Sequence, residues 1–564
     1  MRLTVLALVA TLFVFPCLAQ QNAFVIDSEG RAMATIDLER ASVTSKVSLP
    51  FEPYRALLAP DGRSLLVLDR GAGTVGFWAG EFRPKGKSRA AILSGEKVIG
   101  QTELGWGLAE AAFSKDGTSA YVLTTGYESN KPAERKESEL IRLDAATGQV
   151  AGRIAFDAAA EAFATDSTGS RGIVYSPAYP KKKPSPLPAR VTFVDLKGFK
   201  AGMSIDLAGD VRKPVAVGDM LYVLDRGMKG AGGHLYVINT TSASLVKTID
   251  LGAEAVMAGS DAGGRVFVLS QAADKKSGRV MIVKGTDVTA EYPGPAAPKF
   301  VSLTPDSRKL YVAGWKEFSV IDLESGKGSP AVELARASFS ILPSRDGKRA
   351  FIVNMDGNQC CRITAFDVEG MKRLTTFLGG SKGERIGQGL AAVALTVVSY
   401  EAGRSLANAS GSETFSYSIY APTARGAARG PLAFGPGEKK VYLVDTQTND
   451  VTIVDAVTGQ RLSTLDAGNG LKEVVSLQDA GVVAGIADSA ITLVDTTSDT
   501  VRTTIPMSGD VVDAVVTPDE RRLVVFGKER IVIIDAASAK EIGRIESLKR
   551  PTRVLFPTTK LPKS

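Results

Sequence analysis

Short apolar runs separated by turn residues recur along most of the chain, and many of them end in aspartate. Such runs close at Asp37, Asp144, Asp195, Asp322, Asp367, Asp455, Asp495 and Asp535, with Asn239 in a ninth copy. Neighbouring copies lie about 40 to 50 residues apart, or about twice that distance, which is the spacing of a repeat architecture. Over the whole chain this period predicts about twelve repeat units.

The unit at 431–468 shows the internal plan most clearly. Its apolar and β-branched runs lie at 432–434, 441–444, 451–455 and 461–465, with Gly437, Asn449 and Gly459 in the turns between them. Runs of this composition joined by Gly, Asn and Asp turns predict a four-stranded antiparallel meander. The second run is apolar throughout in several units, as at 65–68, 120–123 and 310–313. A strand of this kind is buried on both faces.

Four-stranded sheets that are buried on both faces and repeat at this period are the blades of a β-propeller. We therefore predict an all-β fold of about twelve four-stranded antiparallel blades. Because one ring typically has about four to eight blades, we expect two propellers in tandem. The first would span residues 20–337 with about seven blades, and the second residues 338–564 with about five and an irregular insertion at 379–430. A division into six and six blades is the alternative.

The repeat carries a recognisable set of motifs: the Pro60-Asp61-Gly62 turn, the Tyr311-Val312-Ala313 strand, Val320-Ile321-Asp322 and the Thr458-Gly459 turn. This set resembles the YVTN-type β-propeller repeats of secreted and cell-surface bacterial proteins, and the resemblance covers nearly all of the chain after residue 19. The resemblance implies the β-propeller architecture. It implies no catalytic residue, because the repeat motif contains none.

The two ends of the chain complement each other. The first unit begins at its second strand, Phe24-Val25-Ile26-Asp27, and lacks an inner strand. The tail at 552–556 has the pattern of an inner strand without a blade. We expect this tail to complete an otherwise open ring and so to remove an exposed sheet edge. The sequence leaves open which blade it joins.

The amino terminus predicts a secretory signal peptide at residues 1–19. Arg2 precedes an apolar run at 3–15, and Cys17 and Ala19 place small residues before a cut after Ala19. A membrane anchor needs about 20 apolar residues, and this run is too short for one. A lipoprotein signal that uses Cys17 is the other alternative. We therefore expect a secreted or periplasmic protein without a membrane span.

The amino-acid composition limits the kinds of ligand and catalysis that we expect of this chain. Hydrophobic residues make up 44% and charged residues 23% of the 564 residues, as in globular proteins. The net charge of +7 is mild for this length, and the only basic run is the short one at 181–183, so we expect no nucleic-acid partner. A single histidine leaves little scope for histidine-based metal or acid–base chemistry. We therefore predict no catalytic residue, no metal and no cofactor, although one sequence does not reveal a calcium or quinone site.

Connection lengths predict a binding face. In a blade of strands a to d, the b–c and d–a connections leave the ring on one side, and the long segments at 95–107, 125–137, 177–188 and 379–389 all belong to them. Insertions gathered on one face usually mark the binding face of a repeat protein. The alternative is loop growth that the fold merely tolerates.

Two equivalent tripeptides on that rim are candidate ligand contacts. Asp69-Arg70-Gly71 and Asp225-Arg226-Gly227 both follow the end of a Val-Leu strand. Arg70 and Arg226 are predicted to bind a carboxylate or phosphate if they face a common funnel. The alternative is that each arginine pairs with a nearby aspartate and helps to hold its turn.

Two further features have open interpretations. Cys360 and Cys361 are adjacent and, in an oxidising compartment, would form a vicinal disulfide or simply enter a strand with one side chain on each face. His234 begins a strand, where it is either a general base or, as we prefer, a structural residue. The repeated aspartates at the ends of Val-Ile-Asp runs are too regular for one active site and are expected to accept turn hydrogen bonds.

These features favour a secreted, non-enzymatic propeller that binds a protein, peptide or glycan through its loop-rich rim. The alternative is a propeller enzyme or enzyme subunit, either associated with a quinoprotein dehydrogenase or similar to a lactonase. Neither the ligand nor the oligomeric state follows from the sequence.

Overall fold

The computed structural model of the protein describes residues 22–378 and 429–557. Short gaps within these ranges lie at 63, 76–81, 128–130, 158, 179–186, 210, 212–213, 228–231, 253, 262, 272–275, 299, 305, 335–337, 345, 357–358, 431, 446–447 and 509–510. The predicted signal peptide at 1–19 and most of the predicted insertion at 379–430 lie outside the described residues.

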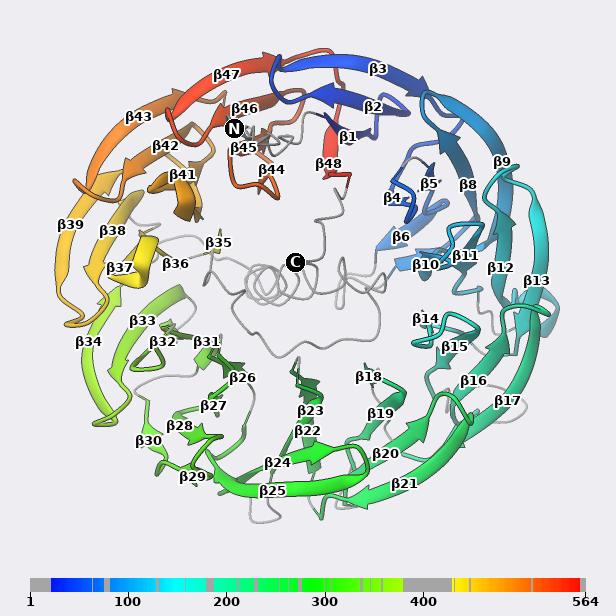
Figure 1. Ribbon diagram of the computed structural model, residues 1–564, viewed down its shortest axis with the longest axis horizontal. Helices are drawn as coiled ribbons and strands as arrows, with labels where there is room; N and C mark the ends of the chain where they lie inside the picture. Colours follow the sequence, from blue (N-terminus) through cyan, green and yellow to red (C-terminus); the bar gives the residue numbers. More distant parts are fainter. Residues whose placement is uncertain are drawn as a thin grey trace, which may run out of the picture.

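The described strands form eleven four-stranded antiparallel sheets around one centre, which is a β-propeller ring (Figure 1). In each sheet, or blade, we call the innermost strand a and the outermost strand d. The short 3-10 turns η1 (Pro132–Glu134), η3 (Pro436–Glu438) and η4 (Gln478–Ala480) are the only helical elements among these residues. None of the helices described is long and apolar enough to cross a membrane.

The first four blades contain the following strands. Blade 1 has β48 (Pro551–Leu555), β1 (Asn22–Asp27), β2 (Ala32–Asp37) and β3 (Ser42–Ser48). Blade 2 has β4 (Arg55–Leu58), β5 (Ser64–Leu68), β8 (Lys87–Ser94) and β9 (Lys97–Trp106), and the pair β6 (Gly73–Val75) and β7 (Phe82–Pro84) lies between β5 and β8 in the sequence. Blade 3 has β10 (Glu110–Phe113), β11 (Ser119–Leu123), β12 (Ser138–Asp144) and β13 (Val150–Phe156). Blade 4 has β14 (Ala162–Thr165), β15 (Arg171–Ser176), β16 (Ala189–Asp195) and β17 (Lys200–Leu207).

Blades 5 to 8 follow the same order. Blade 5 has β18 (Val215–Val217), β19 (Met220–Asp225), β20 (His234–Asn239) and β21 (Ser244–Asp250). Blade 6 has β22 (Glu254–Ser260), β23 (Arg265–Gln271), β24 (Gly278–Lys284) and β25 (Asp287–Gly294). Blade 7 has β26 (Phe300–Leu303), β27 (Lys309–Ala313), β28 (Glu317–Asp322) and an outer strand divided into β29 (Lys327–Gly328) and β30 (Val332–Glu333). Blade 8 has β31 (Ser338–Pro343), β32 (Arg349–Asp356), β33 (Gln359–Asp367) and β34 (Lys372–Leu378).

Three blades complete the ring. Blade 9 has β36 (Leu432–Phe434), β37 (Lys440–Asp445), β38 (Asp450–Asp455) and β39 (Arg461–Asp466). Blade 10 has β40 (Leu471–Leu477), β41 (Val482–Ala487), β42 (Ala490–Asp495) and β43 (Thr500–Pro506), and the two-residue strand β35 (Arg429–Gly430) pairs with β40. Blade 11 has β44 (Asp513–Val516), β45 (Arg522–Phe526), β46 (Ile531–Asp535) and β47 (Lys540–Ile545).

The prediction of about twelve blades was one blade too high. Asp367 closes β33 in blade 8 and Asp455 closes β38 in blade 9, so the described structure has adjacent blades at the two ends of an interval that we had counted as two repeats. Residues 379–428 between them lie outside the described residues. The assumption of an even repeat spacing therefore gave one blade too many between Asp367 and Asp455.

Two tandem rings are not seen either. Figure 1 shows the eleven sheets around one centre. The core continues across the expected boundary at residues 337 and 338, because Tyr311 and Phe318 of blade 7 pack in one cluster with Ile341 and Ile352 of blade 8. The expectation rested on the usual size of single rings, and the packing between blades 7 and 8 overrides it.

Burial on both faces of each sheet explains why the apolar second runs form strands. In β5, Leu65 to Leu68 are at most 1% exposed. Eleven hydrophobic clusters are described, and each joins two consecutive blades, including blades 11 and 1. Burial of a Val, Leu, Ile or Phe side chain contributes about 1.5–3 kcal/mol. The packing between sheets is therefore the main source of stability.

The two ends of the chain close the ring in blade 1. Strand β48 pairs antiparallel with β1, with Val554 opposite Val25, so the prediction that the tail completes the ring is confirmed. The structure also decides what the sequence left open, because the tail joins the first blade. Strands b, c and d of this blade come from the amino-terminal end and strand a from the carboxy-terminal end (Figure 1).

A buried carboxylate ties this closure together. Asp27 is fully buried, and its Oδ1 accepts hydrogen bonds from the backbone N–H groups of Lys549 (3.0 Å), Arg550 (2.9 Å) and Gly30 (3.2 Å). The ammonium of Lys46 lies 2.7 Å from Oδ2. Burial raises the pKa of Asp27, but the hydrogen bonds from Lys46 and the backbone outweigh it, and the pKa is lowered from 3.8.

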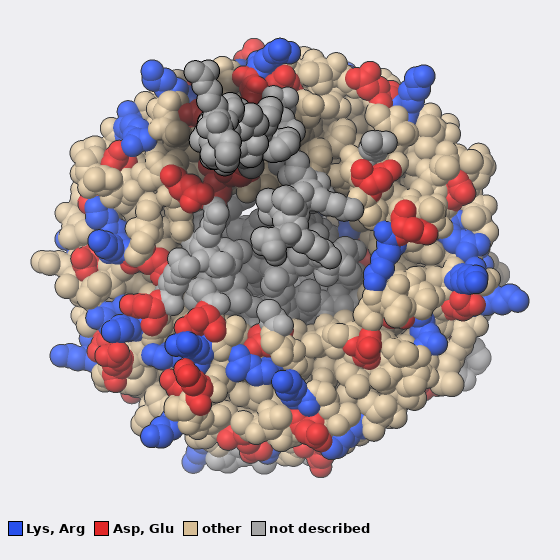
Figure 2. All heavy atoms as spheres, in the orientation of Figure 1, with Lys and Arg blue, Asp and Glu red and all other residues tan. Residues whose placement is uncertain are grey.

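The charged side chains on the visible face do not form a patch of one sign. Figure 2 shows Lys and Arg interspersed with Asp and Glu around the ring, with the face hollowed at its centre. This distribution agrees with the mild net charge of +7.

Replacement of Asp27 tests the closure. Asp27→Asn should lower the free energy of unfolding by about 1–3 kcal/mol at pH 7, because Lys46 loses its buried partner. The lowered pKa of Asp27 means that its contribution is complete above pH 3.8 and is lost as the pH falls through the lower folded value. Urea unfolding measured from pH 7 to pH 3 should show the difference between wild type and variant shrinking at the acidic end.

The control for this prediction is Glu29→Gln. Glu29 pairs with Arg550 at 3.1 Å, but both side chains are 55% exposed, so its loss should cost less than about 0.5 kcal/mol. Equal effects of the two variants would contradict a special role for Asp27 in closure.

Candidate ligand-binding rim

The two sides of the ring differ in their connections. Because strands a to d are sequential and antiparallel, the b–c and d–a connections leave the ring on one side, called here the b–c rim, and the a–b and c–d turns on the other, called the turn face. On the b–c rim of blade 2 the connection includes the β6–β7 pair, and in blade 3 Tyr127 and Lys136 form an isolated bridge. The turn face has short turns, such as the four residues between Asp37 and Ser42.

Aromatic side chains lie on the b–c rim of blades 2 and 3. Tyr54, just before β4, is 45% exposed, and the Arg70 guanidinium lies 5.0 Å from its ring centroid. Trp106 at the end of β9 and Tyr127 in the next blade have ring centroids 5.8 Å apart. Gly107 has φ +67°, and a Cβ there would lie 2.3 Å from the Thr125 hydroxyl. This glycine therefore lets the two connections approach each other.

A second exposed aromatic side chain lies on the rim of blade 7. Trp315 follows β27 and is 47% exposed. Ser338 of blade 8 holds this turn with two hydrogen bonds. Its hydroxyl donates to the Gly314 carbonyl at 2.6 Å, and its N–H donates to the Trp315 carbonyl at 3.1 Å. A large amphipathic ring on a well-held turn is the kind of side chain that contributes strongly to binding.

We did not single out these aromatic residues from the sequence. Trp106 lies between Gly105 and Gly107, Gly126 precedes Tyr127, and Gly314 precedes Trp315. An aromatic residue beside a glycine, outside the strand pattern, is a signal that a reader of the sequence has available.

The aspartates of the two predicted tripeptides have turn-holding roles. Asp69 is 7% exposed and accepts the N–H of Gly71 at 2.7 Å, and its other oxygen lies 2.6 Å from the guanidinium of Arg89. Asp225 is 4% exposed and accepts the N–H of Gly227 at 3.1 Å. Both carboxylates thus fix the start of a b–c connection.

The structure does not bring the two predicted arginines together. Arg70 belongs to blade 2 and Arg226 to blade 5, with blades 3 and 4 between them (Figure 1). Arg70 stacks on Tyr54, and the carbonyl of Arg226 accepts the N–H of Ala255 at 2.9 Å. The partner of Asp69 is Arg89 and not the neighbouring Arg70. Binding of a carboxylate or phosphate by either arginine stays a prediction.

The remaining predicted residues occupy strands. Cys360 and Cys361 both lie in β33, with Cys360 opposite Met355 in the register, and the vicinal disulfide stays a prediction. His234 begins β20, and its Nδ1 lies 3.3 Å from Oδ2 of Asp225. The structure therefore gives this histidine a carboxylate partner that sequence reasoning missed.

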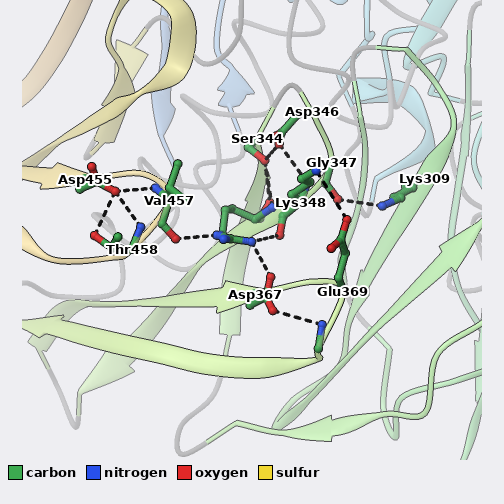
Figure 3. Close-up of polar contacts among 12 residues, drawn as sticks. Lys309, Ser344, Asp346, Gly347, Lys348, Asp367, Glu369, Asp455, Val457 and Thr458 are labelled. Atoms are coloured by element: carbon green, nitrogen blue, oxygen red, sulfur yellow. Dashed lines mark hydrogen bonds and ion pairs between the residues drawn. The ribbon is translucent and has the colours of Figure 1, made fainter.

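The repeated aspartates accept turn hydrogen bonds, as we expected. Asp455 accepts the N–H groups of Val457 and Thr458 at 2.9 and 2.7 Å (Figure 3). The same bonds recur at Asp37, Asp144, Asp322 and Asp495. The Ser498 N–H and the Arg502 guanidinium lower the pKa of Asp495 to about 2. These carboxylates are committed to structure.

Basic side chains on the turn face link several blades to the next blade. The first residue of strand b donates to a turn carbonyl of the following blade in five cases: Arg171 to Thr240 (2.7 Å), Arg265 to Ser307 (2.7 Å), Lys309 to Gly347 (3.0 Å), Arg349 to Val457 (2.8 Å) and Lys440 to Thr496 (2.9 Å). Figure 3 shows the surroundings of one such link, with Lys309, Asp367 and Val457 labelled. Part of the basic excess thus has a structural use.

No group of three or more His, Cys, Asp or Glu side chains suited to a metal occurs among the described residues. No family model matches the chain, and no curated protein matches it.

Several solved structures are similar to this chain at low identity. Dihydro-heme d1 dehydrogenase NirN in complex with DHE is 12% identical over 95% of this chain and 75% of that one, with a TM-score of 0.34. A eukaryotic initiation factor is 14% identical over 79% and 96%, with a TM-score of 0.39. Kuenenia stuttgartiensis hydrazine synthase is 14% identical over 62% and 92%, with a TM-score of 0.27. Such TM-scores support no inference about the chemistry of this chain.

Removal of one blade-to-blade link should destabilise the ring. Arg349→Met keeps the aliphatic stem but leaves the Val457 carbonyl and Asp367 without this donor. We expect a loss of about 1–3 kcal/mol in urea unfolding. The control Arg40→Met removes an ion pair of 3.9 Å from a side chain that is 84% exposed, and should cost less than about 0.5 kcal/mol. A loss no larger than that of the control would argue against the link.

Proposed function

We propose that this chain is an exported, non-enzymatic propeller that binds a protein, peptide or glycan through its b–c rim. The observation that carries the proposal is the contrast between the two faces. The turn face is made of short turns whose aspartates and basic residues bond to the backbone. The b–c rim carries the longer connections together with exposed aromatic side chains, Tyr54 and Trp315 among them.

The chemistry of the rim suits such ligands. Aromatic rings supply contact area at low entropic cost and stack on apolar faces, while their polar tips and the nearby backbone form hydrogen bonds. Export is part of the proposal. It is supported by the signal-peptide pattern at residues 1–19 and by the resemblance to YVTN-type repeats of exported proteins.

Replacement of rim aromatics tests the proposal. The mature chain, its Tyr54→Ala/Trp315→Ala variant and Val457→Ala are immobilised and exposed to periplasmic extract, secreted proteins and a glycan array. Val457 is 57% exposed but lies in a turn on the other face, so it is the matched control. Loss of a rim hot spot costs at least about 2 kcal/mol, and we expect ligand retained by the aromatic variant to fall by at least about tenfold.

The result that would overturn the proposal is a ligand that both variants retain equally. Metal and quinone analysis of the purified wild-type protein addresses the alternative of a propeller enzyme or enzyme subunit. A stoichiometric metal or quinone would favour that alternative, because a simple binding rim needs neither.

A further inference from the structure

The outer strand of every described blade has an extra residue at the same place. In blade 5, Leu245 and Lys247 of β21 pair with two consecutive residues of β20, so Val246 is an extra residue, or β-bulge. In nine other blades the same shift in register lies at Thr44, Ile99, Ala151, Met203, Thr289, Leu374, Leu462, Arg502 and Ile542. In blade 7, the two residues 319–320 of β28 lie opposite the three residues 329–331, between β29 and β30.

These outer strands present their free edge on the outside of the ring. Strand d is the last strand of each sheet in the described structure, and the outer strands form its perimeter (Figure 1). The N–H and C=O groups along such an edge are a template for pairing with another chain. The edge of the ring is therefore a place where a second molecule could add a strand.

The same strands also expose apolar side chains. Eight of the twelve large hydrophobic side chains that are exposed among the described residues lie at a bulge or next to one: Val98, Ile99, Met203, Leu245, Val246, Val288, Leu462 and Val501. An exposed edge with apolar residues of high β-propensity is the typical site of edge-to-edge association. The outer wall therefore needs some protection against it.

A bulge supplies such protection, because it leaves one residue out of the ladder, bends the strand and increases its twist. A second strand cannot keep regular pairing across that point, and proteins use bulges and lysines on edge strands for this purpose. Several outer strands of this ring also carry a basic residue, such as Lys200 or Lys247. Strand β25 has neither lysine nor arginine, yet it has the bulge at Thr289. The bulge is thus the feature that all the described outer strands share.

We propose that the repeated bulge keeps the outer edges of the ring from pairing with a second copy of this chain. A second copy is the partner that matters most, because it presents the same apolar edges, and edge pairing would join rings side by side. The bulge lets the outer wall carry exposed valine, leucine and isoleucine without association through these strands. This inference does not depend on which ligand the rim binds.

Deletion of the bulge in blade 5 tests the proposal against a matched control. The control is Lys247→Thr, which removes the basic residue from β21 and keeps the bulge. Its ion pair with Asp287, at 3.3 Å, joins side chains that are 47% and 74% exposed, so its loss should cost little stability. The test variant combines Lys247→Thr with deletion of Val246, which makes the pairing between β20 and β21 regular. We expect its self-association constant, measured by sedimentation equilibrium, to be at least about tenfold higher than that of the control.

Two results would contradict the proposal. If the bulge only bends the strand around the ring, its deletion changes the free energy of urea unfolding, and the two variants associate equally. The second measurement uses the wild-type protein and so does not require that either variant folds. Amide hydrogen exchange in the outer strands should be the same over about a hundredfold range of protein concentration. Protection of these amides that increases with concentration would show that the bulged edges pair, and would refute the inference.

Discussion

The structure depends on the packing of every sheet against both of its neighbours. Each blade has two apolar faces, and each of the eleven clusters is formed by two consecutive blades. A linear stack would leave two such faces exposed to water, and the ring removes both. At the last interface, β48 from the end of the chain pairs with β1 and adds Val554 to the cluster that joins blades 11 and 1. Buried Asp27 adds hydrogen bonds to this closure, since its carboxylate accepts the backbone N–H groups of Lys549 and Arg550.

The two faces of the ring use their polar residues differently. On the turn face, aspartates accept the N–H groups of their own turns, and basic residues at the start of strand b donate to the next blade. These groups are satisfied within the protein and leave little free chemistry. On the b–c rim, Tyr54 and Trp315 present large ring surfaces to solvent. A molecule that contacted these rings on the b–c rim would therefore break few of the protein's own hydrogen bonds.

Equivalent positions in repeated blades also show where the repeat has diverged. Asp69 and Asp225 fix equivalent turns, yet the partner of one is Arg89 and that of the other is His234. The surrounding backbone also differs, because Val211 forms a bridge with Asp225 in blade 5, whereas the β6–β7 pair follows Asp69 in blade 2. Repetition thus supplies an internal reference against which a single unusual residue is recognised.

The sequence by itself determined the class of fold, the four-stranded plan and the turn role of aspartates such as Asp455, because strand period and turn chemistry are local properties. It also indicated that the tail completes a ring. Only the tertiary structure decided that the ring has eleven blades, that the tail joins β1, and that Arg70 and Arg226 lie in blades 2 and 5, with two blades between them. It also placed Tyr54 under Arg70 and His234 beside Asp225. These are contacts between separate strands or connections, and a local pattern contains no information about which distant segments the closure of the ring will bring together.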